Sequence, residues 1–419
     1  MKKILFAAFA ATLLAAGCQK TEIIGLDSDQ ANGPAMSFST EMKKITKADD
    51  LEALATNSGF KNLVAQGFNV WAYADFDIKN STNVDKTTGI FDGMTNWYVE
   101  GTPSNDNVTA ATWSARKQFY WPGKEKKLQF FAVSADSKQT VSAPTDNPKP
   151  VSYTVNIKPK FTANSLITSD ATAPIMTITG FSVDENANED LMVADFLTQD
   201  QESKDANGTA GKVALNFRHT LSKVEFVFKT TSDPTAPAVY IQSLNVTKLN
   251  NTGTLEVKPA SQPTTPTTNI PVTTVVTPKW INQDGEITFG KEATGDIPLE
   301  QGKTLDYLMN EDGKTYVYQH SNGDLLSSAP TEAYVTWLMM PQTLTPASQI
   351  EVIYVIKDRQ FKSIFPLIAN DVKTKQSIDK WEENKYTKYT ITLSPNLISF
   401  DADVSDDWED ADNEIEHQN

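Results

Sequence analysis

The sequence of 419 residues has very few groups that could carry chemistry: one cysteine, Cys18, and three histidines. With one thiol the chain cannot form an intramolecular disulfide, so its stability must come from packed cores. His219, His320 and His417 lie far apart and lack the spacing of a metal site. The sequence has neither a glycine-rich phosphate loop nor a G-x-S-x-G nucleophile motif. We therefore expect no cofactor, no metal and no enzymatic activity.

Positive charge and long apolar runs are also scarce. The 37 Lys and Arg residues against 53 Asp and Glu residues give a net charge of −16. This balance argues against binding nucleic acid and against electrostatic docking on an anionic lipid surface. The acidic C-terminal region, residues 401–412, lacks the glycine turn and terminal glutamate of a calcium-binding EF-hand loop. We interpret it as a solvated acidic tail.

What the N-terminus does contain is a short export signal. Lys2 and Lys3 precede an apolar stretch, residues 4–16, that is shorter than the roughly 20 residues of a membrane-spanning helix. Its size and flanks are those of a secretory signal. The stretch ends in Leu-Ala-Ala-Gly-Cys, which resembles the bacterial lipobox, where cleavage between Gly17 and Cys18 leaves an acylated cysteine. The alternative is an ordinary signal peptide with a chance cysteine.

Beyond the signal, the chain is dominated by the period-two alternation of β-strands. Helical patterns are few, the best being residues 49–64, with a weaker one at residues 301–310. Many short strands separated by turn signals are typical of β-sandwiches. We therefore predict an all-β fold with minor α content, built of two tandem antiparallel Greek-key β-sandwich domains. The alternating apolar sets are Met36 and Phe38; Phe68, Val70 and Ala72; Val213, Leu215 and Phe217; Val224, Phe226 and Phe228; Val352, Tyr354 and Ile356; and Tyr389, Ile391 and Leu393.

A polar stretch at residues 198–211 predicts a domain boundary at about residue 205. Residues 259–278 contain five prolines and many threonines. Since proline cannot donate to a strand ladder, we expect an extended loop there, inside the second domain. The expected divisions are residues 1–17 as signal peptide, 18–47 as lipid leash and N-terminal strand, 48–205 and 206–400 as the two sandwich domains, and 401–419 as an acidic C-terminal strand and tail.

Five motifs follow one another along the chain. They are Phe119-Tyr120-Trp121-Pro122 with Leu128-Gln129-Phe130-Phe131-Ala132, then residues 190–194, 213–224 and 338–342, and lastly Trp381, Tyr386 and residues 389–393. Together they resemble the motifs of fimbrillins, the lipoprotein pilins of type V pili. The resemblance implies two transthyretin-like domains in a structural subunit of a pilus, located at the surface of the cell outer membrane and then in the fimbrium. The chain departs from the family pattern at Asn384, where a glycine-bearing turn is expected.

The resemblance also implies a mechanism of assembly. In fimbrillins the N-terminal strand completes the first domain, a protease specific for arginine or lysine removes it, and a terminal strand of another subunit fills the groove. Residues 35–42 alternate as such a strand would. The lysines that follow, Lys43, Lys44 and Lys47 before Ala48, form a candidate processing site, with Lys47 favoured. An ordinary surface lysine cluster is the alternative.

The C-terminal region has the alternation of a candidate donor strand. Its apolar positions are Ile398, Phe400, Ala402, Val404 and Trp408, and Asp406 interrupts them. One apolar and one acidic face would let such a strand enter a groove and stay soluble on its other side. The alternative is the ordinary last strand of the second domain.

Other roles stay open at this point. The expected partners are other pilin subunits, the membrane through the lipid, and a host glycan or protein. The chain could instead be an anchor or a tip adhesin of the same pilus. It could also be a glycan-binding lipoprotein that stacks sugars on Trp97, Tyr98 and Trp113. We interpret His219 as a packed, hydrogen-bonded residue at a strand end.

Overall fold

The fold was obtained as a computed structural model. It describes residues 34–42, 63–74, 89–91, 98–103, 111–115, 120–121, 128–134, 154–158, 174–183, 190–203, 210–233, 235–260, 272–297, 322–357, 359–395 and 398–405. Regular structure in these ranges is β-strand, apart from one helical turn at residues 63–66. That turn is the only described part of the helix expected at residues 49–64, and the expected helix at 301–310 lies outside the described ranges. Within the described residues, no helix has the length and apolar character needed to span a membrane.

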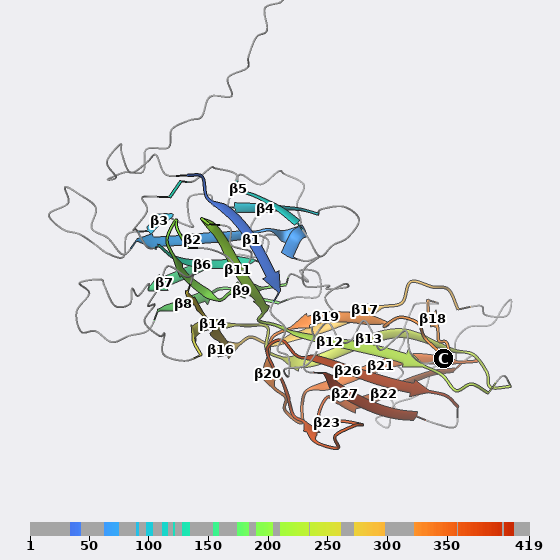
Figure 1. Ribbon diagram of the computed structural model, residues 1–419. Coiled ribbons are helices and arrows are strands. Elements are labelled where there is room, and N and C mark those ends of the chain that lie inside the picture. The colour runs from blue at the N-terminus through green and yellow to red at the C-terminus, as the bar shows by residue number, and fades with distance from the viewer. Residues whose placement is uncertain are drawn as a thin grey trace, which may run out of the picture.

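The strands form two lobes that lie end to end (Figure 1). Those of the first lobe are β1 (Ser37–Met42), β2 (Phe68–Ala74), β3 (Gly89–Phe91), β4 (Tyr98–Pro103), β5 (Ala111–Ala115), β6 (Leu128–Ser134), β7 (Thr154–Lys158), β8 (Ile175–Thr179), β9 (Met192–Ala194), β10 (Phe196–Gln199), β11 (Lys212–His219), β14 (Thr252–Pro259), β15 (Val272–Thr274) and β16 (Val276–Asp284). A ten-stranded sheet follows the path β1-β11-β9-β6-β2-β4-β5, with β3, β10 and β15 beside it. A four-stranded sheet of order β16-β14-β8-β7 completes the lobe.

Alternation along the central strands of the ten-stranded sheet supplies two separate cores. In β2, Phe68 and Val70 enter the core on one face, which also holds β1. Trp71, the residue after Val70, enters the core on the other face, which is shared with the four-stranded sheet and continues into the second lobe. In β6, Phe130 and Phe131 divide in the same way. The sheet is therefore covered on both faces, as its apolar runs require.

The second lobe is a sandwich of a four-stranded sheet, β19-β12-β26-β27, and a five-stranded sheet, β17-β13-β21-β22 with β18 at its side. Its strands are β12 (Ser222–Lys229), β13 (Val239–Leu249), β17 (Ile287–Glu292), β18 (Asp324–Leu325), β19 (Val335–Met339), β20 (Gln342–Thr343), β21 (Gln349–Ile356), β22 (Arg359–Pro366), β23 (Ala369–Asn370), β24 (Ser377–Ile378), β25 (Lys380–Trp381), β26 (Tyr386–Leu393) and β27 (Ile398–Ser405). The prediction of an all-β sandwich fold is confirmed. Strand pairs in the described residues are antiparallel except for β1 with β11 and β12 with β26, which are parallel.

The two lobes do not divide at residue 205. β11 lies in the first lobe beside β9, so the chain leaves that lobe only after His219. It then returns, because β14 pairs with β8 and β15 pairs with β10. The expectation that residues 259–278 form a loop inside the second domain is therefore wrong, since the described residues 272–278 belong to strands of the first lobe. The polar stretch that suggested the boundary precedes a strand that is still needed to complete the first sheet.

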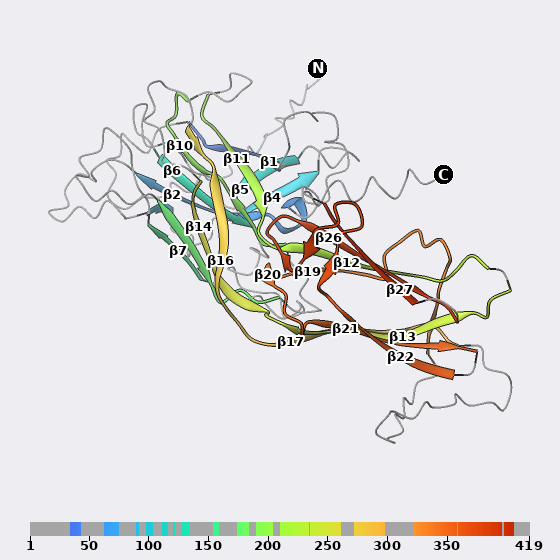
Figure 2. The same ribbon diagram turned by 90° about the horizontal axis from the view of Figure 1, so that it is seen from below.

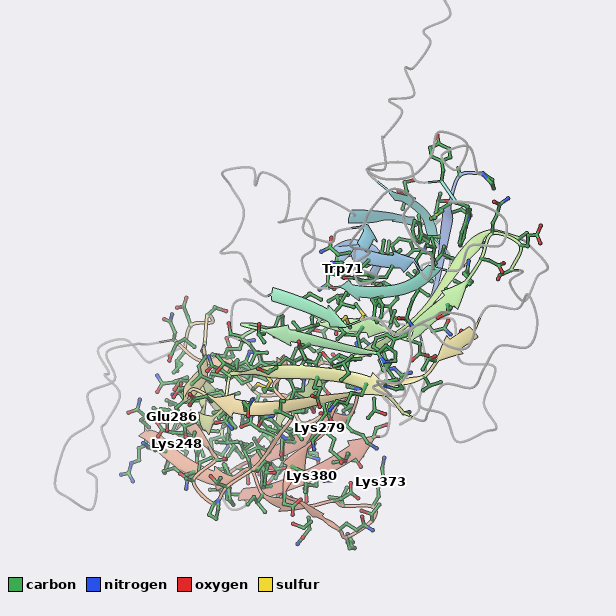
Figure 3. All side chains as sticks on the ribbon, turned by 90° about the vertical axis from the view of Figure 1, so that its left-hand side faces the viewer. Trp71, Lys248, Lys279, Glu286, Lys373 and Lys380 are labelled. Carbon is green, nitrogen blue, oxygen red and sulfur yellow. The ribbon has the colours of Figure 1, made fainter. Side chains whose placement is uncertain are left out.

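A long two-stranded ribbon joins the lobes. β13 pairs with β17 in the second lobe, and its continuation β14 pairs with β16 in the first, so the ribbon runs through both (Figure 2). Between the two parts, the Gln342 side chain accepts a hydrogen bond from the Asn250 amide and donates one to the Asn250 carbonyl, at 2.8 and 3.1 Å. Lys248 and Glu286 form an exposed ion pair of 2.6 Å across the same bend (Figure 3). The amide pair and the continuous core make the lobes one packed unit.

Candidate assembly site

The feature of the first lobe that bears on function is the position of β1 at the edge of the ten-stranded sheet. β1 pairs in parallel with β11, from Ser37 opposite Lys212 to Met42 opposite Phe217. Among the described strands β11 is its only ladder partner. β5, at the far end of the sheet path, lies close to β1, so the sheet curls toward closure. The described N-terminal strand therefore occupies a slot between β11 and β5.

The side chains of β1 fill the core inside this curl. Met36, Phe38 and Met42 are 5%, 6% and 8% exposed. The ring of Phe38 meets Phe68 edge-on, with centroids 6.0 Å apart. Burial of each such side chain contributes about 1.5–3 kcal/mol, so removal of β1 would uncover a substantial apolar slot.

One inward position of β1 does not fit this pattern. Thr40 pairs with Leu215 and points to the same side as Phe38 and Met42, because alternate residues of a strand share a face. Its Oγ1 is shielded from solvent and has no hydrogen-bond partner among the described residues. A buried hydroxyl without a partner is destabilising. The strand that fills the slot therefore carries one poorly matched group.

Tyr120 and Trp121, from the first sequence motif, hold the start of β1. The Trp121 amide donates to the Pro34 carbonyl at 3.1 Å, and Ala35 forms an antiparallel bridge with Tyr120. The Trp121 indole Nε1 donates to the Gly211 carbonyl, also at 3.1 Å. Gly211 has φ +72°, and a Cβ there would lie 3.3 Å from that Nε1, so glycine suits the contact. The motif thus joins the first residues of β1 to the start of β11.

At the other end of the chain, β27 is the outer strand of its sheet and pairs antiparallel with β26. Phe400 stacks on Tyr389 and on Phe365, with centroids 5.5 and 5.4 Å apart. Ala402 is 2% exposed, whereas Ile398 is 49% exposed. Val404 is half-buried against the core. The candidate donor strand therefore lies in a sheet of its own subunit, which agrees with the alternative interpretation of this segment as the last strand of the second domain.

A loop between β23 and β24 lies along the free edge of β27. The Val372 amide donates to the Ala402 carbonyl at 2.8 Å, and the Val404 amide donates to Asp371 Oδ2 at 2.9 Å. Lys373, at the surface in Figure 3, forms an ion pair with Asp403 at 2.8 Å. Sequence reasoning missed this role of Asp371, although an aspartate before a turn is a common signal for such local amide bonds.

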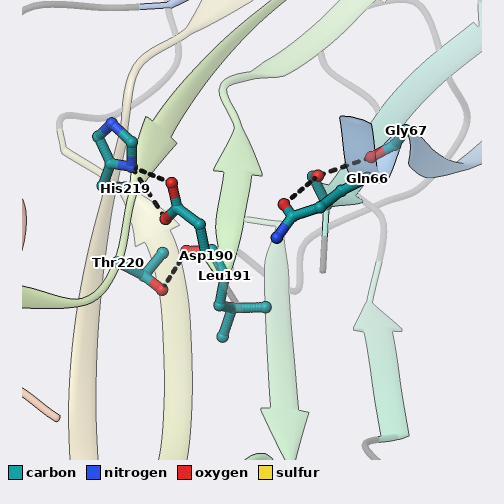
Figure 4. A network of polar contacts seen from close by, with 7 residues as sticks. Gln66, Gly67, Asp190, Leu191, His219 and Thr220 are labelled. Atoms are coloured by element: carbon teal, nitrogen blue, oxygen red, sulfur yellow. Dashed lines mark hydrogen bonds and ion pairs between the residues drawn. The ribbon is translucent and has the colours of Figure 1, made fainter. Parts of the chain in front are cut away.

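The polar residues of the motifs serve the fold. His219 Nδ1 lies 2.9 Å from Asp190 Oδ1, and both side chains are buried, which confirms the packed, hydrogen-bonded interpretation of His219 (Figure 4). Thr220 Oγ1 donates to the Leu191 carbonyl at 2.7 Å in the same network. Asn384 adopts φ 56°, so this asparagine supplies the left-handed turn for which the family pattern suggested glycine.

Several predicted site residues fall outside the described ranges. They are Gly17, Cys18, Lys43, Lys44, Lys47, Ala48, Trp97 and Trp408. The Tyr98 backbone is part of β4, but its side chain is not described. Trp113 is half-buried, with its ring 5.1 Å from that of Phe68. Within the described residues, no group of three or more His, Cys, Asp or Glu side chains could hold a metal ion.

Comparison with solved structures finds matches along nearly the whole chain. A fimbrial protein from Bacteroides vulgatus is 14% identical, with a TM-score of 0.36, and the match covers 88% of this chain and 98% of that one. A fimbrial assembly protein from Parabacteroides distasonis is 11% identical, with a TM-score of 0.33 and coverage of 89% and 98%. A protein from Bacteroides ovatus, described as a candidate cell adhesion protein, is 10% identical, with a TM-score of 0.38 and coverage of 90% and 98%.

Among curated protein sequences, no match to this chain was found. A family model described as fimbrillin-like matches residues 65–408. That span begins in the helical turn before β2, includes every strand from β2 to β27, and excludes β1. It covers most of the 419 residues. The chain therefore belongs to the fimbrillin-like family.

Proposed function

We propose that this chain is a structural subunit of a cell-surface pilus that assembles by strand exchange after its N-terminal strand has been removed. Membership of the fimbrillin-like family supports the pilus role. The observation that carries the exchange step is the position of β1: a short edge strand, paired with β11, whose apolar side chains fill a core of the first lobe. An unpaired strand edge next to an open apolar slot binds a replacement strand strongly.

The proposal assigns the N-terminal segment to export and protection. Acylation at Cys18 would hold the precursor on the outer membrane while β1 fills the slot. Lys43 is the first residue after β1, with Lys44 and Lys47 close behind. A cut after any of these lysines would separate β1 from the rest of the chain without breaking another of the described strands.

N-terminal sequencing of the protein shed from cells, with negative-stain microscopy of purified chain before and after limited trypsin treatment, tests this proposal. We expect a mature form that begins after one of the three lysines, and filaments only after cleavage. The matched control replaces Lys43, Lys44 and Lys47 by Gln, which should leave β1 in place and prevent filaments. A mature form that still begins at Cys18 would contradict the processing step and favour an anchor subunit.

The donor in this proposal is the C-terminal strand, β27, of another copy. A chain that ends at Leu393 keeps the slot but loses the donor. Alone, it should form no filaments after cleavage. Mixed with the cleaved full-length chain, it should still accept a strand and shorten the filaments. Normal filaments from the truncated chain alone would exclude the donor role of β27.

A further inference from the structure

The two terminal strands carry the same residue pattern. Residues 36–42 read MSFSTEM and residues 398–404 read ISFDADV. The seven positions match in type, in the order apolar, serine, phenylalanine, polar, small, acidic and apolar. No other described strand is placed as these two are, at opposite ends of the described chain and at the outer position of a sheet path.

The equivalence extends to three-dimensional structure. Phe38 and Phe400 each point inward from an edge strand and contact aromatic rings of the neighbouring core, Phe68 in one case and Tyr389 with Phe365 in the other. Each strand runs beside a single ladder partner, β1 parallel to β11 and β27 antiparallel to β26. A slot that holds the ring of Phe38 can therefore take the ring of Phe400.

The two strands differ chemically at one inward position. Thr40 places a shielded hydroxyl, with no hydrogen-bond partner among the described residues, where β27 has Ala402. A methyl group in that place needs no partner, so the unfavourable burial of the hydroxyl disappears. The other inward positions change only from methionine to isoleucine or valine, or stay phenylalanine. Residues 398–404 thus fit the slot better than β1 at the position of Thr40, because Ala402 buries no unpartnered hydroxyl there.

Resting on the proposed strand exchange, we propose that residues 398–404 of a second copy enter the slot in the register of residues 36–42. Phe400 then takes the place of Phe38, and Ala402 that of Thr40. The incoming strand runs parallel to β11, as β1 does. Because Ser39 pairs with Ala214, this register places Asp401 of the incoming strand opposite Ala214. The hydroxyl of Thr40 is then a built-in weakness that favours replacement of β1 once the chain is cut.

Disulfide trapping tests the register. In a full chain with Cys18→Ser, the introduced cysteines are the only thiols. The pair Ala214→Cys and Asp401→Cys places both thiols on the outward face of paired strands, within the Cα separation that a disulfide accepts. Ala214→Cys with Ser399→Cys, and Ala214→Cys with Asp403→Cys, are matched controls displaced by two residues in either direction. After trypsin cleavage and mild oxidation, we expect a ladder of covalent multimers on non-reducing gels from the first pair alone.

The possible outcomes test the proposed register and the proposed strand exchange separately. A ladder from either control in preference to the 214 and 401 pair would overturn the register. Filaments that form without any cross-link among the three pairs would also overturn it, while leaving pilus assembly intact. If the cleaved chain with Cys18→Ser and no other change forms no filaments, the proposed strand exchange fails, and this inference fails with it.

The role of Thr40 has its own test, which leaves β27 unchanged. Thr40→Val replaces the unpartnered hydroxyl by a methyl group of similar size and should hold β1 in the slot for longer. We expect filament formation after cleavage to slow by about tenfold. Thr40→Ser keeps the hydroxyl, and its filaments should form no more slowly than those of the wild-type chain. Equal rates for Thr40→Val and the wild type would overturn the role assigned to Thr40.

Discussion

The backbone amide of Val404 donates a hydrogen bond to the Asp371 carboxylate, with 2.9 Å between the nitrogen and Oδ2. Asp371 also accepts from the Lys373 amide at 2.9 Å, so one side chain shapes its own loop and secures the outer edge of β27. That edge would otherwise present free backbone groups. The strand that we propose as the donor is therefore held on one side by β26 and on the other by this loop.

The Asp371 contact should make stability depend on pH. Burial alone would raise the pKa of Asp371, but hydrogen bonds from Thr374, Val404 and Lys373 outweigh it and hold the pKa below its ordinary value of 3.8. Because the folded-state pKa is depressed, the carboxylate stabilises the fold fully above that ordinary value. This contribution disappears as the pH falls through the folded-state pKa.

We therefore expect Asp371→Asn to lower the free energy of unfolding by about 1–2 kcal/mol near neutral pH and by clearly less at about pH 2, where part of the carboxylate's contribution has been lost. Urea denaturation at the two pH values measures the difference. Asp401→Asn, which changes an exposed carboxylate on the same strand, is the control and should cost little at either pH. A penalty for Asp371→Asn that does not change with pH would contradict this account.

The Phe400 ring should contribute much of the free energy that holds β27 in its sheet. Its ring stacks on both Tyr389 and Phe365, so Phe400→Ala removes contacts with both sheets of the second lobe. We expect a loss of about 2 kcal/mol in the free energy of unfolding, below the usual value for a fully buried ring because Phe400 is half-buried. Ile398→Ala, on the same strand but exposed, should cost less than about 0.5 kcal/mol. Equal losses for the two variants in urea denaturation would contradict the stacking role.

The buried pair of Asp190 and His219 should show strong coupling. Removing His219 alone leaves the Asp190 carboxylate buried without its partner, so His219→Ala should cost about 3 kcal/mol. The double variant Asp190→Ala with His219→Ala should lose clearly less than the sum of the two single losses, because no charge is then left unpaired. Denaturant unfolding of the four chains gives the coupling energy, and additive losses would show that the pair does not act as a unit.

Trp121 and Trp280 offer a matched pair of substitutions. Each indole donates to a buried backbone carbonyl, Trp121 to Gly211 at 3.1 Å and Trp280 to Thr220 at 2.7 Å. Replacement of either by Phe should cost about 1–2 kcal/mol through the lost hydrogen bond. Trp121→Phe alone should also speed hydrogen exchange at the amides of β1, because Trp121 holds the start of that strand. Faster exchange of β1 in Trp280→Phe to the same degree would contradict this local role.

Local patterns predicted which side chains face inward. The alternation at Phe68, Val70 and Ala72, and again at Val213, Leu215 and Phe217, is found in β2 and β11, where all six side chains are buried. Met36 and Phe38 marked a strand at the N-terminus that the structure contains. These predictions succeeded because side chains alternate between the two faces of any strand, whatever its neighbours are.

The same patterns could not predict strand partners. Nothing in residues 252–284 says that β14 will pair with β8 while β13, just before it, pairs in the other lobe. The boundary expected at residue 205 failed for this reason, and so did the loop expected at residues 259–278. The amide pair of Gln342 with Asn250 is equally invisible in the sequence, since the two residues lie 92 positions apart.

The sequence by itself determined the inward and outward faces of the strands, the sandwich class and the motifs by which the family is recognised, because each depends on short stretches of residues. Only the tertiary structure decided that β1 lies parallel to β11 at the edge of a curled sheet, that the hydroxyl of Thr40 is shielded there, and that Asp371 secures β27. Strand ladders join backbone groups that nearly every residue has, so their partners are set by long-range packing and not by local sequence.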